Sequence, residues 1–182
     1  QKIKDALQII MSGDEKMLNS FIKGFRDDFM KLRPEDIAYP RSVNGVSKYT
    51  DNSSGHDVSI NLLDMKQQIV QYNLFKKRAP IHVKGAILYN HLVEKHKMNN
   101  KLVYIQEGDK IKFLHMKEPN IYQSSSISFI TELPKGLGLH GMIDYELQFE
   151  KSFVEPLKFI TDKVLWRIDD SYGTQGTLED FF

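Results

Sequence analysis

The 182-residue sequence predicts an α+β fold that is mainly helical, with a small antiparallel β element and a flexible C-terminal tail. Long stretches carry apolar residues at helical spacing, which is typical of amphipathic helices. The short apolar runs 102–105 and 111–116 flank the turn Glu107-Gly-Asp109 and indicate a hairpin of two strands. No periodicity remains after Arg167, so we expect the end of the chain to be a flexible tail.

A capping box at Ser12-Gly-Asp-Glu15 predicts the start of an amphipathic helix, because its side chains can bond the free N–H groups of a first turn. An apolar series at helical spacing follows, and we expect its aromatic side chains to lie in the core. Pro34 is expected to end this helix, and Asp27-Asp28 falls on its polar side. The series consists of Met17, Leu18, Phe21, Ile22, Phe25 and Phe29.

The middle of the chain predicts one loop and two helices. Residues 50–59 are rich in Ser, Asn, Asp and Gly, which is typical of a loop. A helix is expected over 61–75, with a break near Ala79-Pro80. Another helix is expected from His82 to Lys97, directly after that proline.

The last third of the chain predicts one more strand and a long helix. The strand is expected over 127–130, and Leu133-Pro-Lys-Gly136 then breaks the pattern. The helix is expected over 143–165, where Pro156 can kink or split it.

The composition is that of a globular chain, with 41% apolar and 27% charged residues. This length allows one substantial domain or two small ones. The sequence has no cysteine, so it forms neither disulfides nor thiolate metal sites, which suits a reducing cytoplasm. No apolar run approaches the roughly 20 residues of a membrane span. Gln1 is not an initiator residue, and we therefore expect a piece of a longer protein.

The charges are unevenly distributed although the net charge is only +1. Residues 1–75 carry ten basic and ten acidic side chains, residues 76–151 carry twelve and eight, and residues 152–182 carry three and six. A basic middle and an acidic end indicate contact with a polyanion followed by a different kind of partner. An excess of this size is also compatible with a merely solvated face.

The sequence predicts no catalytic centre in this chain. Neither Asp27-Asp28 nor Asp169-Asp170 is placed on an apolar strand that could present carboxylates to two metal ions. There is no phosphate-binding glycine loop and no serine in the setting of a nucleophile elbow. The histidines also lack a metal-ligand spacing, namely His82, His91, His96, His115 and His140.

The last eight residues have the pattern of a peptide that binds a sliding clamp. Leu178 and Phe181 are one helical turn apart, so both side chains can enter one apolar pocket. Phe182 can cover the neighbouring surface, and the amide of Gln175 can bond the rim of the pocket. The alternative is an amphipathic stub that docks on the core of its own chain.

Several stretches, in order along nearly the whole chain, resemble the C-terminal thumb of family B replicative DNA polymerases of the T-even-like bacteriophage type. The stretches are Pro40-Arg-Ser-Val-Asn44-Gly-Val-Ser-Lys48-Tyr49, Lys77-Arg-Ala-Pro80-Ile-His82-Val-Lys84-Gly85-Ala, Glu107-Gly-Asp109-Lys110-Ile-Lys112-Phe, Glu132-Leu-Pro134-Lys135, Ile143-Asp144-Tyr145 and Phe149-Glu-Lys151-Ser-Phe153-Val-Glu-Pro156-Leu157.

The resemblance implies a helical palm-to-thumb connection over 1–40, a duplex-binding thumb over 41–166 and a tail with the clamp-binding peptide over 167–182. It implies as partners the primer–template duplex, the sliding clamp and the rest of the polymerase, in the cytoplasm of an infected bacterium. The palm, with its aspartates and magnesium, the fingers and the editing exonuclease would lie upstream. The chain alone would then have no cofactor and would be inactive, although it belongs to a nucleotidyltransferase.

The resemblance also places certain side chains near the duplex backbone, where a polymerase that must hold any sequence contacts phosphates. The first candidates are Lys84, Lys110, Lys135 and Lys151, and the second are Asn44, Lys48, Tyr49 and His82. Lys84 stands where the family often has Arg, so it keeps the charge but not the planar fork that binds phosphate with two bonds. For each lysine the alternative is a solvated surface side chain.

Two other classes of function compete with the polymerase thumb. One is a free-standing accessory factor that binds a clamp and touches DNA with its basic middle. The other is a clamp-recruited nuclease, which the missing carboxylate cluster disfavours. The coding sequence upstream of Gln1 distinguishes the polymerase thumb from the accessory factor, because a palm encoded in frame would identify a polymerase.

Overall fold

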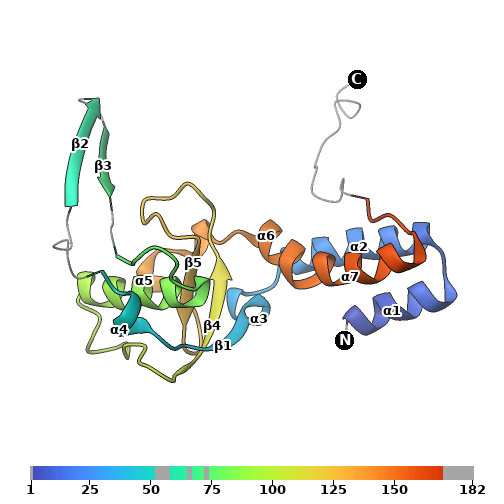
Figure 1. Cartoon of the computed structure of the whole chain (residues 1–182), viewed down its shortest axis with the longest axis horizontal. Coiled ribbons are helices and arrows are strands. Elements are labelled where there is room, and N and C mark those ends of the chain that lie inside the picture. The colour runs from blue at the N-terminus through green and yellow to red at the C-terminus, as the bar shows by residue number, and fades with distance from the viewer. Residues whose placement is uncertain (1, 52–57, 65–66, 72–73, 170–182) are drawn as a thin grey trace. The chain divides into compact units, whose positions relative to one another are not determined.

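A computed structural model of the chain describes residues 2–51, 58–64, 67–71 and 74–169 (Figure 1). The chain divides into two compact units. One, the helical unit, combines the segment up to Leu32 with the segment from Tyr145, and the other, the sheet unit, is Arg33–Asp144. The predicted α+β class is confirmed, with helices predominating beside a small antiparallel sheet. The predicted flexible tail lies mostly outside the described residues.

The helical unit begins with α1 (Lys2–Ser12) and α2 (Glu15–Phe29), which pack on each other. The predicted amphipathic helix is confirmed as α2, but the predicted capping box is wrong. Asp14 is the N-cap, and its Oδ1 accepts the backbone N–H of Met17 at 2.8 Å. The hydroxyl of Ser12 instead donates to the carbonyl of Gln8 at 2.8 Å and closes α1, because one serine cannot serve both helix ends.

The predicted long helix over 143–165 is present in several pieces. It comprises α6 (Tyr145–Phe149), a π-helical turn (Glu150–Val154), α7 (Glu155–Thr161) and a 3-10 turn (Asp162–Val164). Pro156 lies in the first turn of α7, where its missing N–H removes no helical hydrogen bond. The irregular turn therefore lies just before the proline.

Aromatic rings fill the core of the helical unit. The ring centroids of Phe25 and Phe153 are 4.7 Å apart, and those of Phe29 and Phe149 are 5.2 Å apart, in tilted or edge-on geometry. The predicted core role of the apolar series on α2 is therefore confirmed for its aromatic residues. Met17, by contrast, is 54% exposed, because it lies in the first turn of α2.

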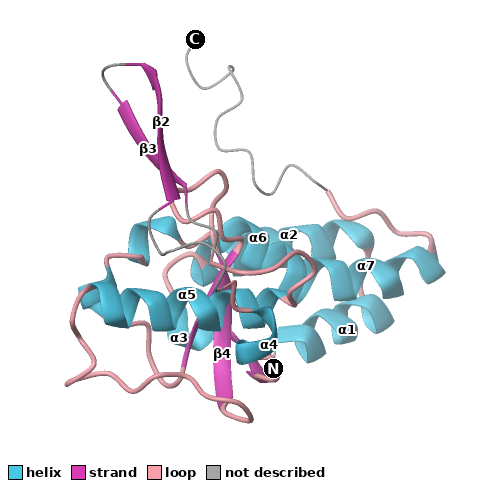
Figure 2. Cartoon of the chain, turned by 60° about the vertical axis from the view of Figure 1, so that its left-hand side comes forward, coloured by secondary structure: helices cyan, strands magenta, loops and turns pink. Residues whose placement is uncertain are grey.

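A three-stranded antiparallel sheet forms the centre of the sheet unit. Its order is β1 (Tyr39–Ser42), β4 (Lys110–His115) and β5 (Ser126–Phe129) (Figure 1). Figure 2 shows the strands in magenta, with β4 labelled. The strands predicted at 111–116 and 127–130 are confirmed as β4 and β5. The strand predicted at 102–105 is wrong.

The side-chain amide of Asn90 bonds the backbone of the segment where this strand was predicted. Asn90 accepts the backbone N–H of Ile105 at 2.8 Å and donates to the carbonyl of the same residue at 2.9 Å. Both backbone groups of Ile105 are thus satisfied without a neighbouring strand. The partner of β4 is β1 instead, which comes from about 70 residues earlier in the chain.

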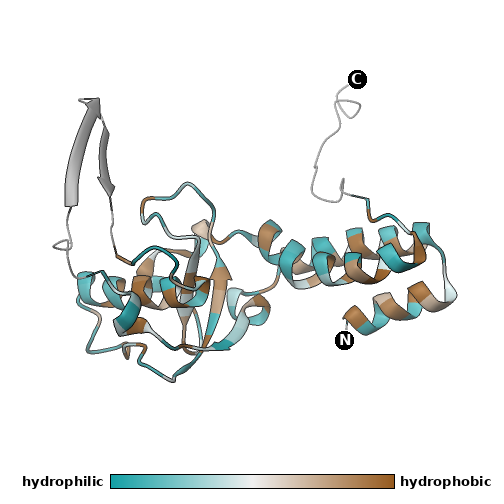
Figure 3. Cartoon of the chain, in the orientation of Figure 1, coloured by the Kyte–Doolittle hydropathy of each residue, from teal (hydrophilic) through white to brown (hydrophobic). Residues whose placement is uncertain are grey.

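The predicted helix from His82 to Lys97 is confirmed as α5 (Ile81–Lys95), which packs against β5 and β4. Many residues of α5 and of the strands that it packs against are hydrophobic (Figure 3), and most of these are buried. A Cβ at Gly85 would lie 2.6 Å from the backbone nitrogen of Ser128, so only glycine allows this approach. The hydroxyl of Ser128 donates to the carbonyl of His82 at 2.7 Å, and that of Ser126 donates to the carbonyl of Ile81 at 2.5 Å.

Short elements complete the sheet unit. They are α3 (Pro34–Ile37), α4 (Val46–Tyr49), the antiparallel pair β2 (Val58–Asp64) and β3 (Gln67–Gln71), and 3-10 turns at Lys135–Leu137 and His140–Met142. Pro34 opens α3 and lies beyond the end of α2.

The helix predicted over 61–75 is wrong, because β2 and β3 occupy most of that range. A short apolar run does not separate a helix from a strand by its periodicity alone. In the loop predicted over 50–59, Asp51 is irregular, 52–57 lies outside the described residues, and β2 begins at Val58.

Candidate nucleic-acid interface

Helix α4 carries two of the predicted site residues, Lys48 and Tyr49, and its first turn is already bonded to a carboxylate. Gly45 precedes the helix with φ of 101°, a left-handed conformation that favours glycine. The carboxylate of Glu107 accepts the backbone N–H of Gly45 at 2.6 Å and that of Ser47 at 3.0 Å. These amides, Gly45 first and Ser47 next, lower the pKa of Glu107 below its ordinary value. The amides of α4 are therefore not open to a phosphate.

The other end of α4 is fixed by the segment that follows β3. Thr50 and Phe75 form an antiparallel bridge. The backbone N–H of Lys76 donates to the carbonyl of Tyr49 at 2.8 Å, and its ammonium donates to the carbonyl of Lys48 at 3.0 Å. Two segments about 25 residues apart in sequence are thereby joined at the predicted site.

Three lysines and two aromatic rings gather at this junction: Lys48, Tyr49, Phe75, Lys76 and Lys84, which we call the basic-aromatic cluster. The Nζ of Lys48 lies 5.1 Å from the ring centroid of Tyr49, and that of Lys84 lies 5.4 Å from the ring centroid of Phe75. Within the described part of the chain, none of the three lysines makes an ion pair with a carboxylate. The rings of Tyr49 and Phe75 are half-buried, and a contact with a ring face uses none of the N–H donors of an ammonium. Each ammonium therefore keeps donors for a phosphate.

The surroundings of His82 favour its neutral form by lowering its pKa. Burial lowers its pKa first, and the positive charge of Arg41 lowers it further. Its ring lies 6.2 Å from that of Phe113. His82 is therefore a weaker candidate for a charged contact with phosphate than the lysines. Arg41 is exposed on β1, so the charge near this point of the sheet comes from a residue that the sequence did not indicate.

The remaining predicted residues of the sheet unit are exposed, and Lys135 lies apart from the cluster in the fold. Asn44 precedes Gly45, and Lys110 pairs with Ser42 at the end of the β1–β4 ladder. Lys135 starts a 3-10 turn that packs on Met98, beyond the C-terminal end of α5. Lys84 lies near the opposite end of this helix of 15 residues, which spans about 22 Å.

Lys151 belongs to the helical unit and forms an ion pair with Glu155 one turn further along the helix. Lys158 similarly pairs with Glu150 at 3.3 Å. The four residues predicted to bind the clamp lie outside the described residues, namely Gln175, Leu178, Phe181 and Phe182.

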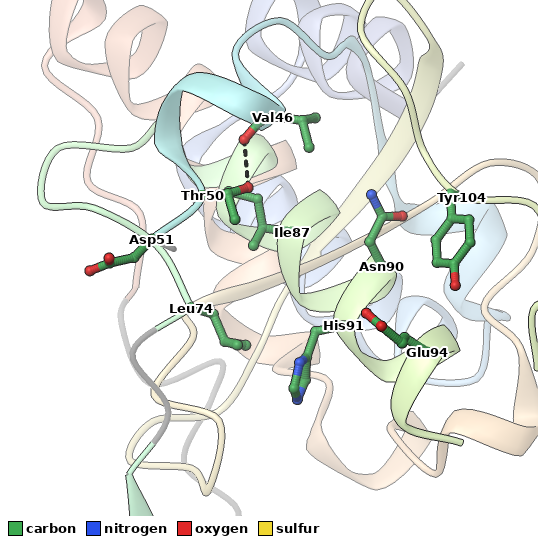
Figure 4. A pocket seen from close by; sticks show the side chains of 9 residues that line it. All are labelled: Val46, Thr50, Asp51, Leu74, Ile87, Asn90, His91, Glu94 and Tyr104. Carbon is green, nitrogen blue, oxygen red and sulfur yellow. Dashed lines mark hydrogen bonds between the residues drawn. The ribbon is translucent and has the colours of Figure 1, made fainter. Parts of the chain in front are cut away.

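A cavity of about 240 Å³ lies beside the cluster, between α4, α5 and the loop that carries Tyr104 (Figure 4). Its lining includes the carboxylates of Asp51 and Glu94, which would repel a phosphate. The hydroxyl of Thr50 donates to the carbonyl of Val46 at 2.6 Å at its wall. The cavity is therefore separate in chemistry from the basic-aromatic cluster.

Sequence reasoning missed Phe75, Lys76, Arg41 and the role of Glu107. Phe75 and Lys76 join the site only through the bridge to Thr50, a long-range pairing that leaves no local pattern. The basic run Lys76-Lys-Arg78 beside an aromatic residue was the available signal, since such runs often mark nucleic-acid contacts.

No protein-family model matches this sequence, and no curated protein matches it either. Among the described residues, no group of three or more His, Asp or Glu side chains is placed to hold a metal ion. In the same part of the chain, each helix is too short or too polar to cross a membrane.

Proposed function

We propose that this chain is the thumb portion of a family B replicative DNA polymerase of the T-even-like phage type. In this proposal the sheet unit grips the primer–template duplex through phosphates, and the C-terminal peptide tethers the polymerase to its sliding clamp. The observation that carries it is the basic-aromatic cluster, in which Lys48, Tyr49 and Lys84 lie on stretches that resemble the family.

The geometry of the cluster suits a contact with any DNA sequence. Backbone hydrogen bonds fix the segments that carry Lys48 and Lys76, and α5 carries Lys84. Three ammonium groups without carboxylate partners in the described residues favour a polyanion by charge. Contacts to phosphates position a protein on DNA without reading bases, which is what a replicative thumb requires.

Duplex binding tests this proposal directly. Two duplexes of equal length and different sequence, titrated with the full chain at the same salt concentration, should give equal affinities, because the contacts go to the backbone. A strong preference for one sequence would contradict the proposal. The pure chain, given primed template, deoxynucleotides and magnesium, should give no extension, and reproducible incorporation would place catalysis in this chain.

Clamp binding requires a separate test. Burying Leu178, Phe181 and Phe182 gains roughly 1.5–3 kcal/mol for each side chain. Ordering the peptide offsets much of this gain, so a dissociation constant on the order of micromolar is expected. Phe181→Ala, or deletion of residues 177–182, should abolish binding to the cognate clamp in calorimetry and leave duplex affinity unchanged. Equal clamp affinity with and without these residues would indicate a hydrophobic stub.

A further inference from the structure

Glu107 is an exposed carboxylate on a well-fixed turn of the sheet unit. The side chain of Asp109 accepts the N–H of Gln106 at 2.8 Å and closes the turn. Val43, which follows β1, donates to the carbonyl of Asp109 at 2.9 Å and accepts from Gly108 at 2.8 Å. The backbone of Glu107 is thus anchored to the strand that leads into α4.

From this anchor the carboxylate reaches a segment about 60 residues earlier in the chain. One oxygen accepts the N–H of Gly45 at 2.6 Å. The other accepts the N–H of Ser47 at 3.0 Å and its hydroxyl at 3.2 Å. Hydrogen bonds to a carboxylate are stronger than those between neutral groups, so this is a firm attachment for a helix of only 4 residues.

A chain of contacts leads from this attachment to the basic-aromatic cluster. A Cβ at Gly45 would lie 2.9 Å from the ring of Tyr49, so the ring lies directly against the Gly45 backbone. The ammonium of Lys48 lies 5.1 Å from the centroid of the same ring. Glu107 therefore holds one end of α4, while Lys76 holds the other end through the carbonyls of Lys48 and Tyr49.

We infer that Glu107 is a positioning residue for duplex binding, a negative charge that strengthens the affinity for a polyanion by holding Lys48 and Tyr49 in place. This inference rests on the proposed function, because it assigns Glu107 to the same interface. A short helix without this attachment would lose its first turn, since isolated helices of this length are unstable in water. Lys48 would then have to be ordered again on binding.

Simple electrostatics predicts the opposite result, which makes the inference easy to test. A carboxylate beside a surface that binds DNA repels the phosphates, so its removal should raise the affinity if charge alone matters. If Glu107 only occupies a site that a phosphate takes when DNA binds, its removal should also raise the affinity. Positioning by Glu107 requires that its removal lowers the affinity.

The test compares Glu107→Gln, Glu107→Asp and Glu118→Gln in the full chain, with a short duplex of mixed sequence as the probe. Glu118 is exposed in the same unit and makes no hydrogen bond in the described residues, so Glu118→Gln removes an equal charge without the attachment. We expect Glu107→Gln to weaken binding roughly 5-fold. The slope of log K against log salt should become shallower by about one, because one phosphate contact is lost. Glu107→Asp keeps the charge but shortens the reach, and should also weaken binding. Glu118→Gln should bind as tightly as the wild type or slightly tighter.

A double-mutant cycle separates positioning from a general loss of structure. Glu107→Gln should have little further effect in a Lys48→Ala background and its full effect in a Lys135→Ala background, because only Lys48 is reached through α4. The amide resonances of Gly45 and Ser47 should shift, while the midpoint of thermal unfolding stays close to that of the wild type.

The outcomes distinguish this inference from the function on which it rests. If Lys48→Ala, Lys76→Ala and Lys84→Ala all bind the duplex as the wild type does, the proposed function fails together with the inference. If these variants weaken binding while Glu107→Gln and Glu107→Asp keep or raise the affinity, only the positioning role of Glu107 is overturned.

Discussion

Two pairs of lysines, one pair in each unit, are held in different ways, although Lys2 and Lys163 of the helical unit also lie over aromatic rings. In the helical unit, Lys151 and Lys158 are paired with glutamates of the same helical stretch. In the sheet unit, Lys48 and Lys84 lie over aromatic rings, and within the described residues neither has a carboxylate partner. Both kinds of lysine look alike in the sequence, since Lys48, Lys84 and Lys151 each stand in a stretch that resembles a polymerase thumb.

This difference shows that a count of charges does not measure the charge available to a ligand. A phosphate that approaches Lys151 must displace or share Glu155, whereas Lys84 lies over the ring of Phe75 and has no ion pair with a carboxylate among the described residues. The pair in the helical unit is itself weak, since both side chains are more than 40% exposed and such pairs contribute about 0.2–1 kcal/mol. Lys151 is thus the weakest of the four lysines first proposed for phosphate contact.

The largest expected effect comes from the aromatic core of the helical unit. Phe149 is fully buried and contacts Phe25, Phe29 and Phe153, so Phe149→Ala should destabilise this unit by about 3–5 kcal/mol. If the sheet unit alone contacts DNA, Phe149→Ala should keep the duplex affinity of the wild type wherever the sheet unit stays folded. Denaturant unfolding and duplex titration measure the two effects.

Phe159→Ala is the matched control for this substitution. Phe159 lies on α7 and is 74% exposed, so its replacement should change stability by less than about 0.5 kcal/mol. Loss of duplex binding in Phe149→Ala, with an intact sheet unit, would mean that the helical unit shares the interface.

The next effect contrasts two helical glycines, one in each unit. Gly85→Ala places a methyl group 2.6 Å from the Ser128 backbone and should destabilise the sheet unit by about 1–3 kcal/mol, with weaker duplex binding because Lys84 is adjacent. Gly24→Ala on α2 meets no atom within 4 Å and should stabilise by about 0.5–1 kcal/mol. The midpoints of thermal unfolding should shift in opposite directions in the two variants. A shift in the same direction would contradict the close contact described for Gly85.

The smallest effect is a dependence on pH. The pKa of His82 is lowered in the folded state, first by burial and then by Arg41, so the unfolded chain binds a proton that the folded chain does not. The free energy of unfolding should therefore fall as the pH decreases below about 6.5, the ordinary pKa of histidine. His82→Asn should flatten this part of the pH profile. An unchanged profile would mean that His82 does not respond to its surroundings in this way.

Most regular elements could be predicted from sequence because local patterns determine them. Helices α2 and α5 and strands β4 and β5 follow apolar periodicity and nearby turn residues. The helix predicted over 61–75 failed because the periodicity of a short apolar run does not separate a helix from a strand. The strand predicted at 102–105 failed because a side chain distant in sequence decides the structure there. Asn90 satisfies the backbone of Ile105 and removes the need for a strand there, and no local pattern reveals this contact.

The candidate site was predictable only in part for the same reason. Lys48, Tyr49 and Lys84 stand in stretches that resemble the family, so they could be singled out. Lys76 and Glu107 act through backbone groups that lie about 28 and 60 residues away in sequence, and the spacing in the chain gives no sign of such contacts. The sequence therefore predicted which charges to consider, and the fold determines which of them gather.

The salt dependence of duplex affinity for Lys84→Ala and Lys151→Ala tests the difference between the two units most directly. For the wild type, log K against log salt should have a slope of roughly −3, or about a 60-fold loss between about 50 and 200 mM salt. Lys84→Ala should shallow this slope by about one, whereas Lys151→Ala should leave it nearly unchanged. Equal changes in both variants, or a change in Lys151→Ala alone, would contradict the claim that the unpaired lysines of the sheet unit contact the phosphates.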